Sequence, residues 1–360
     1  MKLKNLLTLI LTGSFVAGFS GAAYLKKPGE SSLTERRLLA QFPTVSPLDT
    51  TFSSKFDLYA TDQFPLRDIF RTIKATTAVG VLRQLDNHNV YMVNGSASEI
   101  DYPLSEKKVA HAADRVNYVI SKYVTGDTKA YFAVIPDKNA FLAKENGYPA
   151  YDFGDLDELF SSQIVGAEKI DISDLLTIDD YYLTDTHWRQ EKLLPVAKRI
   201  ASAMGVTLSG EYEEKTLDLP FYGVYRGRSA LPMKADRLSY LTNEFLESLT
   251  VFDAETNSDI PVYELTKASG RDPYEMFLSG SKSLLTIENP DSANERSLII
   301  IRDSFGSSLS PLLFEGWSKV TIVDIRYISP DVIGKLVDFE NADLLIMYSA
   351  SVINNSETIN

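Results

Sequence analysis

The sequence contains no cysteine. This absence excludes thiolate metal sites, a catalytic thiol and structural disulfides, so packing of the core must stabilise the fold. Histidine is scarce as well, because His88, His111 and His187 are the three in the chain. A mechanism that needs an imidazole therefore has few candidates. We expect no cofactor and no metal site.

An excess of positive charge is also missing. The chain has 36 Lys and Arg against 49 Asp and Glu, a formal net charge of -13. Proteins that bind nucleic acid through its phosphates need clustered basic residues, so nucleic acid is not an expected partner. The 44% hydrophobic and 24% charged residues are ordinary for a globular protein, and 360 residues suffice for one large domain or two smaller ones.

The first 27 residues form an apolar segment with basic flanks. Lys2 and Lys4 precede a stretch without charge over residues 6–25, and Lys26 and Lys27 follow it. Twenty such residues can span a bilayer as a helix, and the same pattern is typical of a cleavable signal peptide, so both interpretations stay open. With Lys2 and Lys4 inside, the rest of the chain would lie outside the cytoplasm. We therefore expect an extracytoplasmic protein of the cell envelope, either secreted or anchored.

Composition and periodicity divide the remaining chain into four parts. Residues 28–48 are rich in Pro, Ser and Thr and predict a linker. Residues 49–204 predict the first part of an α/β domain, with helices over 52–85 interrupted at Pro65, a hairpin near 90–93 and a helix ending near Tyr123. Residues 205–294, with short Tyr-, Thr- and Gly-rich segments, predict an inserted β-rich lobe. Residues 295–360 predict the second part of the domain.

Short apolar runs predict a mainly parallel sheet. Such runs are typical of strands that are buried on both faces, and helical patterns at 189–204 and 330–339 separate some of them. The expected strands are 130–135, 297–301, 320–325 and 343–347, with a weaker one at 169–172. This alternation predicts an open α/β fold.

A serine follows one of these strands. Residues 302–306 read Arg-Asp-Ser-Phe-Gly, so Ser304 lies where a strand turns into a helix. A hydroxyl at this place is exposed at the carboxyl end of a sheet, near a helix N-terminus that favours developing negative charge. Ser304 is therefore a candidate nucleophile. A serine that simply caps the helix is the structural alternative.

An acid and a base lie close together in a second segment. In Asp185-Thr186-His187-Trp188, the Asp185 carboxylate can bond the ring Nδ1 of His187, which leaves Nε2 to face a serine. The alternative is a histidine that packs at the start of a helix beside Trp188. His88 and His111 have no such setting and are expected to be structural.

Together these segments resemble the DHHW family, which is related to the AlgJ and AlgX alginate O-acetylation proteins. The resemblance is carried by residues 185–188 and 302–306, and it extends to residues 35–43, 62–68 and 135–138. Thr186 departs from it, since the family name implies a histidine there. The resemblance implies a three-layer, flavodoxin-like SGNH hydrolase fold and a Ser304, His187 and Asp185 triad. It also implies an exported polysaccharide as acceptor and a membrane-bound O-acyltransferase as possible acyl donor.

The order of the segments adds an expectation of its own. SGNH enzymes run from serine to Asp-x-His, whereas here Asp185 and His187 precede Ser304, so we expect a circularly permuted fold. Candidate oxyanion or substrate-binding residues lie at strand ends or beside the histidine: Arg326, Tyr348, Ser349, Trp188 and Lys138. A surface ion pair with Asp324 is the alternative for Arg326, and a solvated pair with Asp137 is the alternative for Lys138.

These observations predict a serine-dependent O-acetyltransferase or acetylesterase that acts on a cell-surface or exported polysaccharide through an acyl-serine. The competing hypothesis is a non-catalytic glycan-binding or scaffold subunit of a polysaccharide modification complex. The 19 tyrosines would suit a sugar-binding surface, whereas a binding module has no need of a base aimed at a serine.

Overall fold

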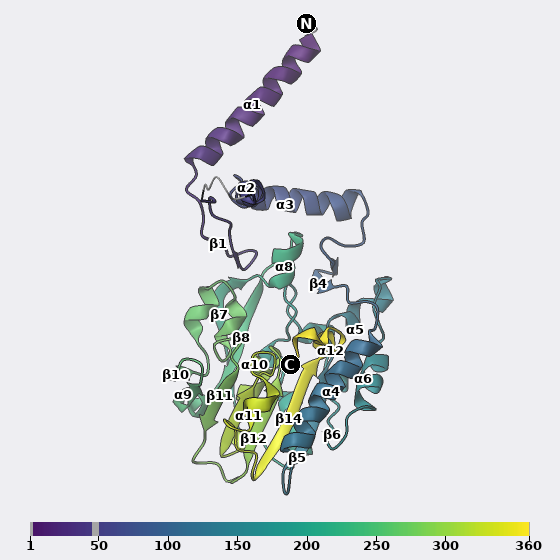
Figure 1. Cartoon of the computed structure of the whole chain (residues 1–360), viewed down its shortest axis with the longest axis vertical. Helices are drawn as coiled ribbons and strands as arrows, with labels where there is room; N and C mark the ends of the chain where they lie inside the picture. Colours follow the sequence, from purple (N-terminus) through teal and green to yellow (C-terminus); the bar gives the residue numbers. More distant parts are fainter. Residues whose placement is uncertain (1–2, 45–49, 360) are drawn as a thin grey trace.

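A twisted eight-stranded sheet forms the centre of the body (Figure 1). The computed structural model describes residues 3–44 and 50–359. Across the sheet the strands are β10 (Ser258–Pro261), β9 (Thr250–Asp253), β11 (Leu284–Glu288), β13 (Lys319–Val323), β12 (Ser297–Arg302), β14 (Ala342–Ser349), β5 (Lys129–Ile135) and β6 (Glu168–Lys169). The five strands from β13 to β6 are parallel, and β11, β9 and β10 add an antiparallel edge.

Apolar side chains on both faces of the parallel strands explain why helices cover both sides. In β12, Leu298 and Ile300 point into one core, and Ile299 and Ile301 point into the other. The first core is closed by α7 (Leu194–Ala203), and the second by α4 (Glu106–Tyr123), α6 (Phe153–Ser161) and α12 (Ala350–Asn354). Burying each such side chain contributes about 1.5–3 kcal/mol. The result is the expected α/β arrangement in three layers.

Several element boundaries differ from the sequence expectation. The strand expected at 320–325 ends at Val323, and the helix expected at 189–204 begins at Leu194, after a 3-10 turn at Gln190–Lys192. The helix expected at 330–339 is the short α11 (Pro330–Ile333). It stops at Gly334, where a Cβ would lie 2.4 Å from the Tyr123 ring. Close packing on α4 therefore fixes this end.

Residues 205–294 do not form one separate lobe. β7 (Glu213–Phe221) and β8 (Asp236–Thr242) pair as an antiparallel ribbon of their own, with α8 (Val224–Ser229) between them. β9, β10 and β11 instead extend the central sheet, because Leu285 and Ile287 of β11 are buried in its core. The remaining short elements are α5 (Asn139–Leu142), α9 (Glu244–Ser248) and α10 (Gly306–Leu309), and the expected hairpin is β3 (Val90–Val93) with β4 (Ser96–Glu99).

An N-terminal unit lies beyond the carboxyl edge of the parallel strands (Figure 1). It comprises α1 (Leu3–Leu25), a strap at residues 29–43 with β1 (Ser31–Ser32) and β2 (Arg37–Leu38), α2 (Phe52–Asp62) and α3 (Arg67–Thr76). No residue of α1 is buried, and the helix is long and apolar enough to cross a membrane, which fits a signal sequence or an anchor. Residues 45–48 of the expected linker lie outside the described residues, and residues 29–43 of it form the strap.

Candidate active site

The candidate nucleophile lies on a turn that buried hydrogen bonds fix. Asp303 Oδ1 accepts the N–H of Phe305 at 3.0 Å, while its Oδ2 accepts the N–H and hydroxyl of Ser349 at 2.8 and 2.7 Å. A Cβ on Gly306 would lie 2.6 Å from Cβ of Arg302, so glycine lets the chain turn this tightly. Ser304 itself is half-buried. The ends of β12 and β14 thus hold its hydroxyl at the sheet edge.

The structure brings His187 and Asp185 to this serine. His187 Nε2 lies 2.8 Å from Oγ of Ser304, and His187 Nδ1 lies 2.6 Å from Oδ1 of Asp185. Because Nδ1 faces a carboxylate, it carries the ring proton and donates a hydrogen bond to Asp185. Nε2 is then free to accept a hydrogen bond from the serine hydroxyl. Burial alone raises the pKa of Asp185, but the His187 hydrogen bond and the charges of His187 and Arg36 outweigh it and hold the pKa well below its usual value. Asp185 therefore stays ionised.

The second oxygen of Asp185 is held by two groups from distant segments. Its Oδ2 accepts the N–H of Val224 at 2.8 Å and lies 3.1 Å from a guanidinium nitrogen of Arg36. The other terminal nitrogen of Arg36 pairs with Asp272 at 2.9 Å. The Arg36 side chain is 10% exposed and that of Asp185 is fully buried, so this ion pair is shielded from water.

Tyr274 and Trp188 fix the ring and the turn. Tyr274 stacks on His187 with ring centroids 3.8 Å apart and planes at 10°. Its hydroxyl donates to Oγ of Ser308 at 2.8 Å, and Trp188 Nε1 donates to the same oxygen at 2.9 Å and to the carbonyl of Phe305 at 3.0 Å. Burial raises the pKa of Tyr274 well above its usual value, so its phenol stays neutral. Trp188 therefore lies beneath the nucleophile turn and not in an open pocket.

Lys138 supports the Asp-x-His loop from behind. Its ammonium donates to the carbonyls of Tyr182 at 2.6 Å and of Leu183 and Asp185 at 3.2 Å. Burial lowers the pKa of Lys138 to about 7, against the opposing charges of Asp236 and Asp185. The interpretation of Lys138 and Asp137 as a solvated pair was wrong, because both side chains are buried. The ammonium of Lys138 is occupied by three backbone carbonyls, and its part in substrate binding stays a prediction.

The other predicted oxyanion candidates make contacts within the protein. Arg326 pairs with Asp324 through Nε at 2.9 Å and a terminal nitrogen at 2.7 Å, as in the surface-pair alternative, although Asp324 is buried. Tyr348 is buried at the end of β14, facing the helical layer of α4 and α12. Ser349 anchors Asp303. These residues shape the edge of the sheet, and their part in binding an oxyanion stays a prediction.

Sequence reasoning did not assign a site role to Arg36, Tyr274 or Val224. Each comes from a segment far from Ser304 and His187 in the chain, and no local pattern ties it to them. The one available signal for Arg36 was the resemblance over residues 35–43. Among residues 3–44 and 50–359, no group of three or more His, Cys, Asp or Glu side chains could hold a metal ion.

Comparisons with known proteins identify solved structures with a similar fold. Neither a family model nor a curated protein sequence matches the chain. A solved DHHW family protein from Eubacterium siraeum is similar at 20% identity and a TM-score of 0.63, over 76% of this chain and 95% of that one. Bacillus cereus PatB1 with a sulfonyl adduct is similar at 15% identity and a TM-score of 0.60, over 73% and 95%. The O-acetyltransferase domain of Pseudomonas putida AlgJ reaches a TM-score of 0.44 at 13% identity, over 74% and 92%. The chain thus shares its fold with the DHHW family protein and PatB1.

Proposed function

We propose that this chain is an extracytoplasmic O-acetyltransferase or acetylesterase that acts on a cell-surface or exported polysaccharide through an acyl-serine. One observation carries the proposal: the continuous hydrogen-bonded chain from Ser304 through His187 to the buried Asp185. This arrangement suits a serine nucleophile with a base and an orienting acid. The acetyl group, the glycan and a membrane-bound O-acyltransferase as donor follow from the motif resemblance.

In the proposed mechanism His187 moves the proton. Nε2 takes it from Ser304 as Oγ attacks the ester carbonyl, and backbone N–H groups at the turn stabilise the oxyanion. The imidazolium, held by ionised Asp185, then protonates the leaving alcohol, and an acyl-serine remains. A sugar hydroxyl or water next gives its proton to Nε2 and attacks the acyl carbon. The imidazolium then returns a proton to Oγ of Ser304 as the bond between Oγ and the acyl carbon breaks. A sugar acceptor gives transfer, and water gives hydrolysis.

The strand order supports the further proposal of a circularly permuted SGNH arrangement. If β12 is counted as strand 1, then β13, β14, β5 and β6 are strands 2 to 5 when the two chain ends are joined. Their order across the sheet then reads 2-1-3-4-5, the flavodoxin-like order. Ser304 follows strand 1, and the Asp185 loop follows strand 5.

Hydrolysis of an aryl acetate by the purified full-length chain tests the function. We expect turnover by the wild type, its loss in Ser304→Ala and His187→Ala, and retention in Ser162→Ala, a control that removes an exposed hydroxyl. Persistent turnover in Ser304→Ala refutes the nucleophile. No turnover, with an acetylated oligosaccharide bound all the same, favours the glycan-binding subunit. Adding an unacetylated oligosaccharide then separates transfer from hydrolysis.

A further inference from the structure

α3 has one face on the body and another that is apolar and exposed. Toward the body, a guanidinium nitrogen of Arg71 donates to the carbonyl of Gly227 at 2.7 Å, and Arg67 bonds Glu35 of the strap. Ile69, Phe70 and Ile73 lie on one side of α3, and Leu66 directly precedes the helix. Leu66, Ile69 and Ile73 are 60%, 55% and 55% exposed. Single exposed apolar residues are ordinary, whereas a continuous stripe indicates a partner.

This stripe continues onto α1. The ring of Phe19 stacks on Phe64 with centroids 5.3 Å apart and lies 5.6 Å from Phe70. Phe19 is six residues before the end of α1 at Leu25, which is about 9 Å along the helix axis. Phe64 and Phe70 therefore lie at the level of the last turns of an apolar helix, where a membrane-spanning segment meets the headgroups.

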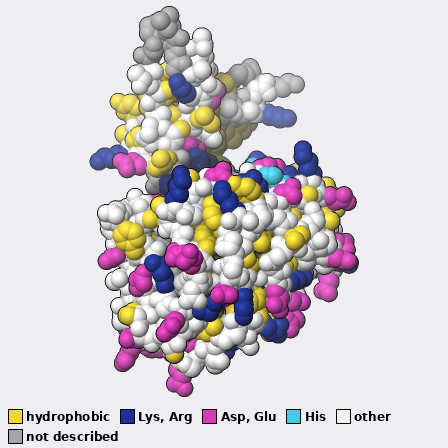
Figure 2. Space-filling model, turned by 60° about the horizontal axis from the view of Figure 1, so that its bottom comes forward, with side chains coloured by type: hydrophobic (Ala, Val, Ile, Leu, Met, Phe, Trp, Pro, Cys, Tyr) yellow, Lys and Arg dark blue, Asp and Glu magenta, His cyan; other side chains and the backbone are white. Residues whose placement is uncertain are grey.

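The arrangement of the N-terminal helices agrees with this depth. α2 and α3 lie across the end of α1 (Figure 1), and Figure 2 shows hydrophobic side chains gathered on this N-terminal unit. Other apolar residues of this region are exposed as well: Phe56 and Leu58 of α2, and Val81 and Leu82 after α3. Lys26 and Lys27 follow α1 directly, and long basic side chains at the end of a membrane-spanning helix reach into the headgroup layer.

We propose that the apolar face of α2 and α3 lies in the interfacial layer of a lipid bilayer, continuous with α1. A bilayer, and not a second copy of the chain, is the occupant because the face adjoins a helix whose length and composition suit a membrane. Burial of the stripe in the headgroup boundary is the behaviour of interfacial amphipathic helices. The proposal goes beyond the proposed reaction and does not depend on the chemistry of Ser304.

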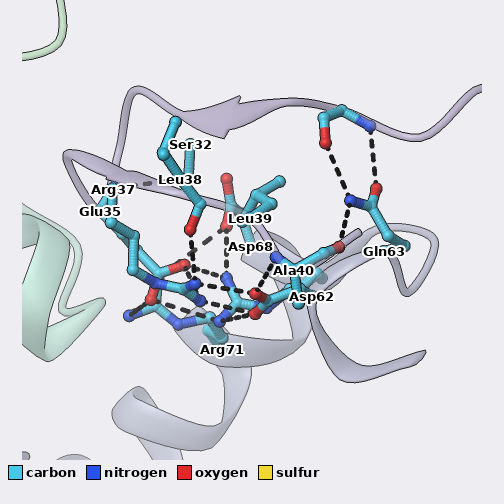
Figure 3. Close-up of polar contacts among 12 residues, drawn as sticks. Ser32, Glu35, Arg37, Leu38, Leu39, Ala40, Asp62, Gln63, Asp68 and Arg71 are labelled. Atoms are coloured by element: carbon cyan, nitrogen blue, oxygen red, sulfur yellow. Dashed lines mark hydrogen bonds and ion pairs between the residues drawn. The ribbon is translucent and has the colours of Figure 1, made fainter. Parts of the chain in front are cut away.

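The strap connects α2 to the body, so the position of the N-terminal helices also sets the orientation of the body. Arg37 makes two hydrogen bonds to Asp62, at 2.8 and 2.6 Å, and Asp62 also accepts the N–H of Ala40 at 2.9 Å (Figure 3). Gln63 bonds the backbone of Gly29 in both directions at 2.9 Å. Arg36, which lies between Gly29 and Arg37 in the chain, pairs with Asp185 of the body. The edge of the sheet that carries Ser304 would therefore face the membrane.

Because the sequence contains no cysteine, a single introduced thiol can be labelled at one defined position. Full-length Ile69→Cys, Ile73→Cys and Val165→Cys would each carry an environment-sensitive fluorophore in vesicles of phosphatidylcholine and phosphatidylglycerol. Val165 is a control that is 71% exposed and precedes β6, at the opposite edge of the sheet. We expect the labels at 69 and 73 to be shielded from aqueous iodide and quenched by a lipid-borne quencher, and the label at 165 to show the reverse.

Two results would overturn the proposal. The first is iodide quenching at 69 and 73 as strong as at 165. The second is shielding that disappears when the protein is diluted with excess lipid, which would assign the face to a second copy. Circular dichroism and the thermal midpoint of each variant establish that it is folded, and neither readout requires enzymatic activity.

Discussion

The Arg36–Asp185 pair gives the sharpest test of how the site is built. Arg36→Gln removes the guanidinium and leaves Asp185 Oδ2 with the N–H of Val224 as its remaining described partner. A hydrogen bond to a charged group contributes about 1.5–3 kcal/mol. If that loss falls on the transition state, kcat/KM for an aryl acetate drops roughly 10- to 150-fold, because each 1.36 kcal/mol is about a factor of ten.

The pH profile separates this role from a general loss of structure. The charged groups that face the His187 and Asp185 pair are Arg36, Asp272 and Lys138, with the neutral phenol of Tyr274 stacked on the ring. Without the Arg36 cation the site becomes more negative, and one of the causes that hold the pKa of Asp185 down is lost. The dependence of kcat/KM on pH should therefore change in Arg36→Gln, whereas a loss of folded protein would lower the activity at every pH.

Arg37→Gln is the matched control. It removes the same charge from the adjacent residue, which pairs with Asp62 and not with Asp185. We expect it to loosen the strap without changing the pH dependence of kcat/KM, whereas Arg36→Lys should restore part of the activity. Wild-type kcat/KM and pH dependence in Arg36→Gln, or an equal shift in Arg37→Gln, would refute the reasoning.

Three further changes test other contacts. Tyr274→Leu removes the stacked ring and should lower kcat/KM roughly 2- to 12-fold, since such aromatic contacts contribute about 0.5–1.5 kcal/mol. Tyr274→Phe keeps a ring and should lower kcat/KM less. Unchanged steady-state kinetics in the leucine variant would contradict this. Gly223→Ala places a Cβ 2.3 Å from that of Asp185 and should lower both the activity and the melting temperature. Gly80→Ala is the control, because nothing lies within 4 Å of the added Cβ. Equal melting temperatures and turnover rates in the two variants would contradict this. Because the pKa of Lys138 is lowered to about 7 in the folded state, the unfolded state binds more protons between about pH 7 and 10.5. The free energy of unfolding in urea should therefore rise with pH in the wild type, and Lys138→Met should remove part of that rise. Parallel curves of unfolding free energy against pH for the two proteins would exclude this contribution.

The sequence predicted those parts of the fold that local patterns determine. The apolar runs around Ile300 and Phe132 indicated buried parallel strands, since a strand covered on both faces has little room for polar residues. The antiparallel edge was missed because β9 and β10 bury fewer of their side chains, and their sequence indicated a separate lobe equally well.

The candidate site was predictable where its residues are adjacent in the chain. Asp185 and His187 form one loop, and Ser304 follows a strand, so spacing and position suggested them. Arg36 and Tyr274 meet this loop only through tertiary packing, which spacing does not encode. Lys138 was misjudged because Pro136-Asp137-Lys138 is typical of an exposed turn, whereas the loop at 182–185 covers it in the fold.

Covalent labelling tests most directly whether His187 activates Ser304. The full-length chain would be treated with a sulfonyl fluoride and digested, and the modified residue located by tandem mass spectrometry. We predict a single sulfonyl adduct on Ser304, formed much more slowly in His187→Ala. Labelling of a different residue, or an equal rate at Ser304 without the imidazole, would contradict the account.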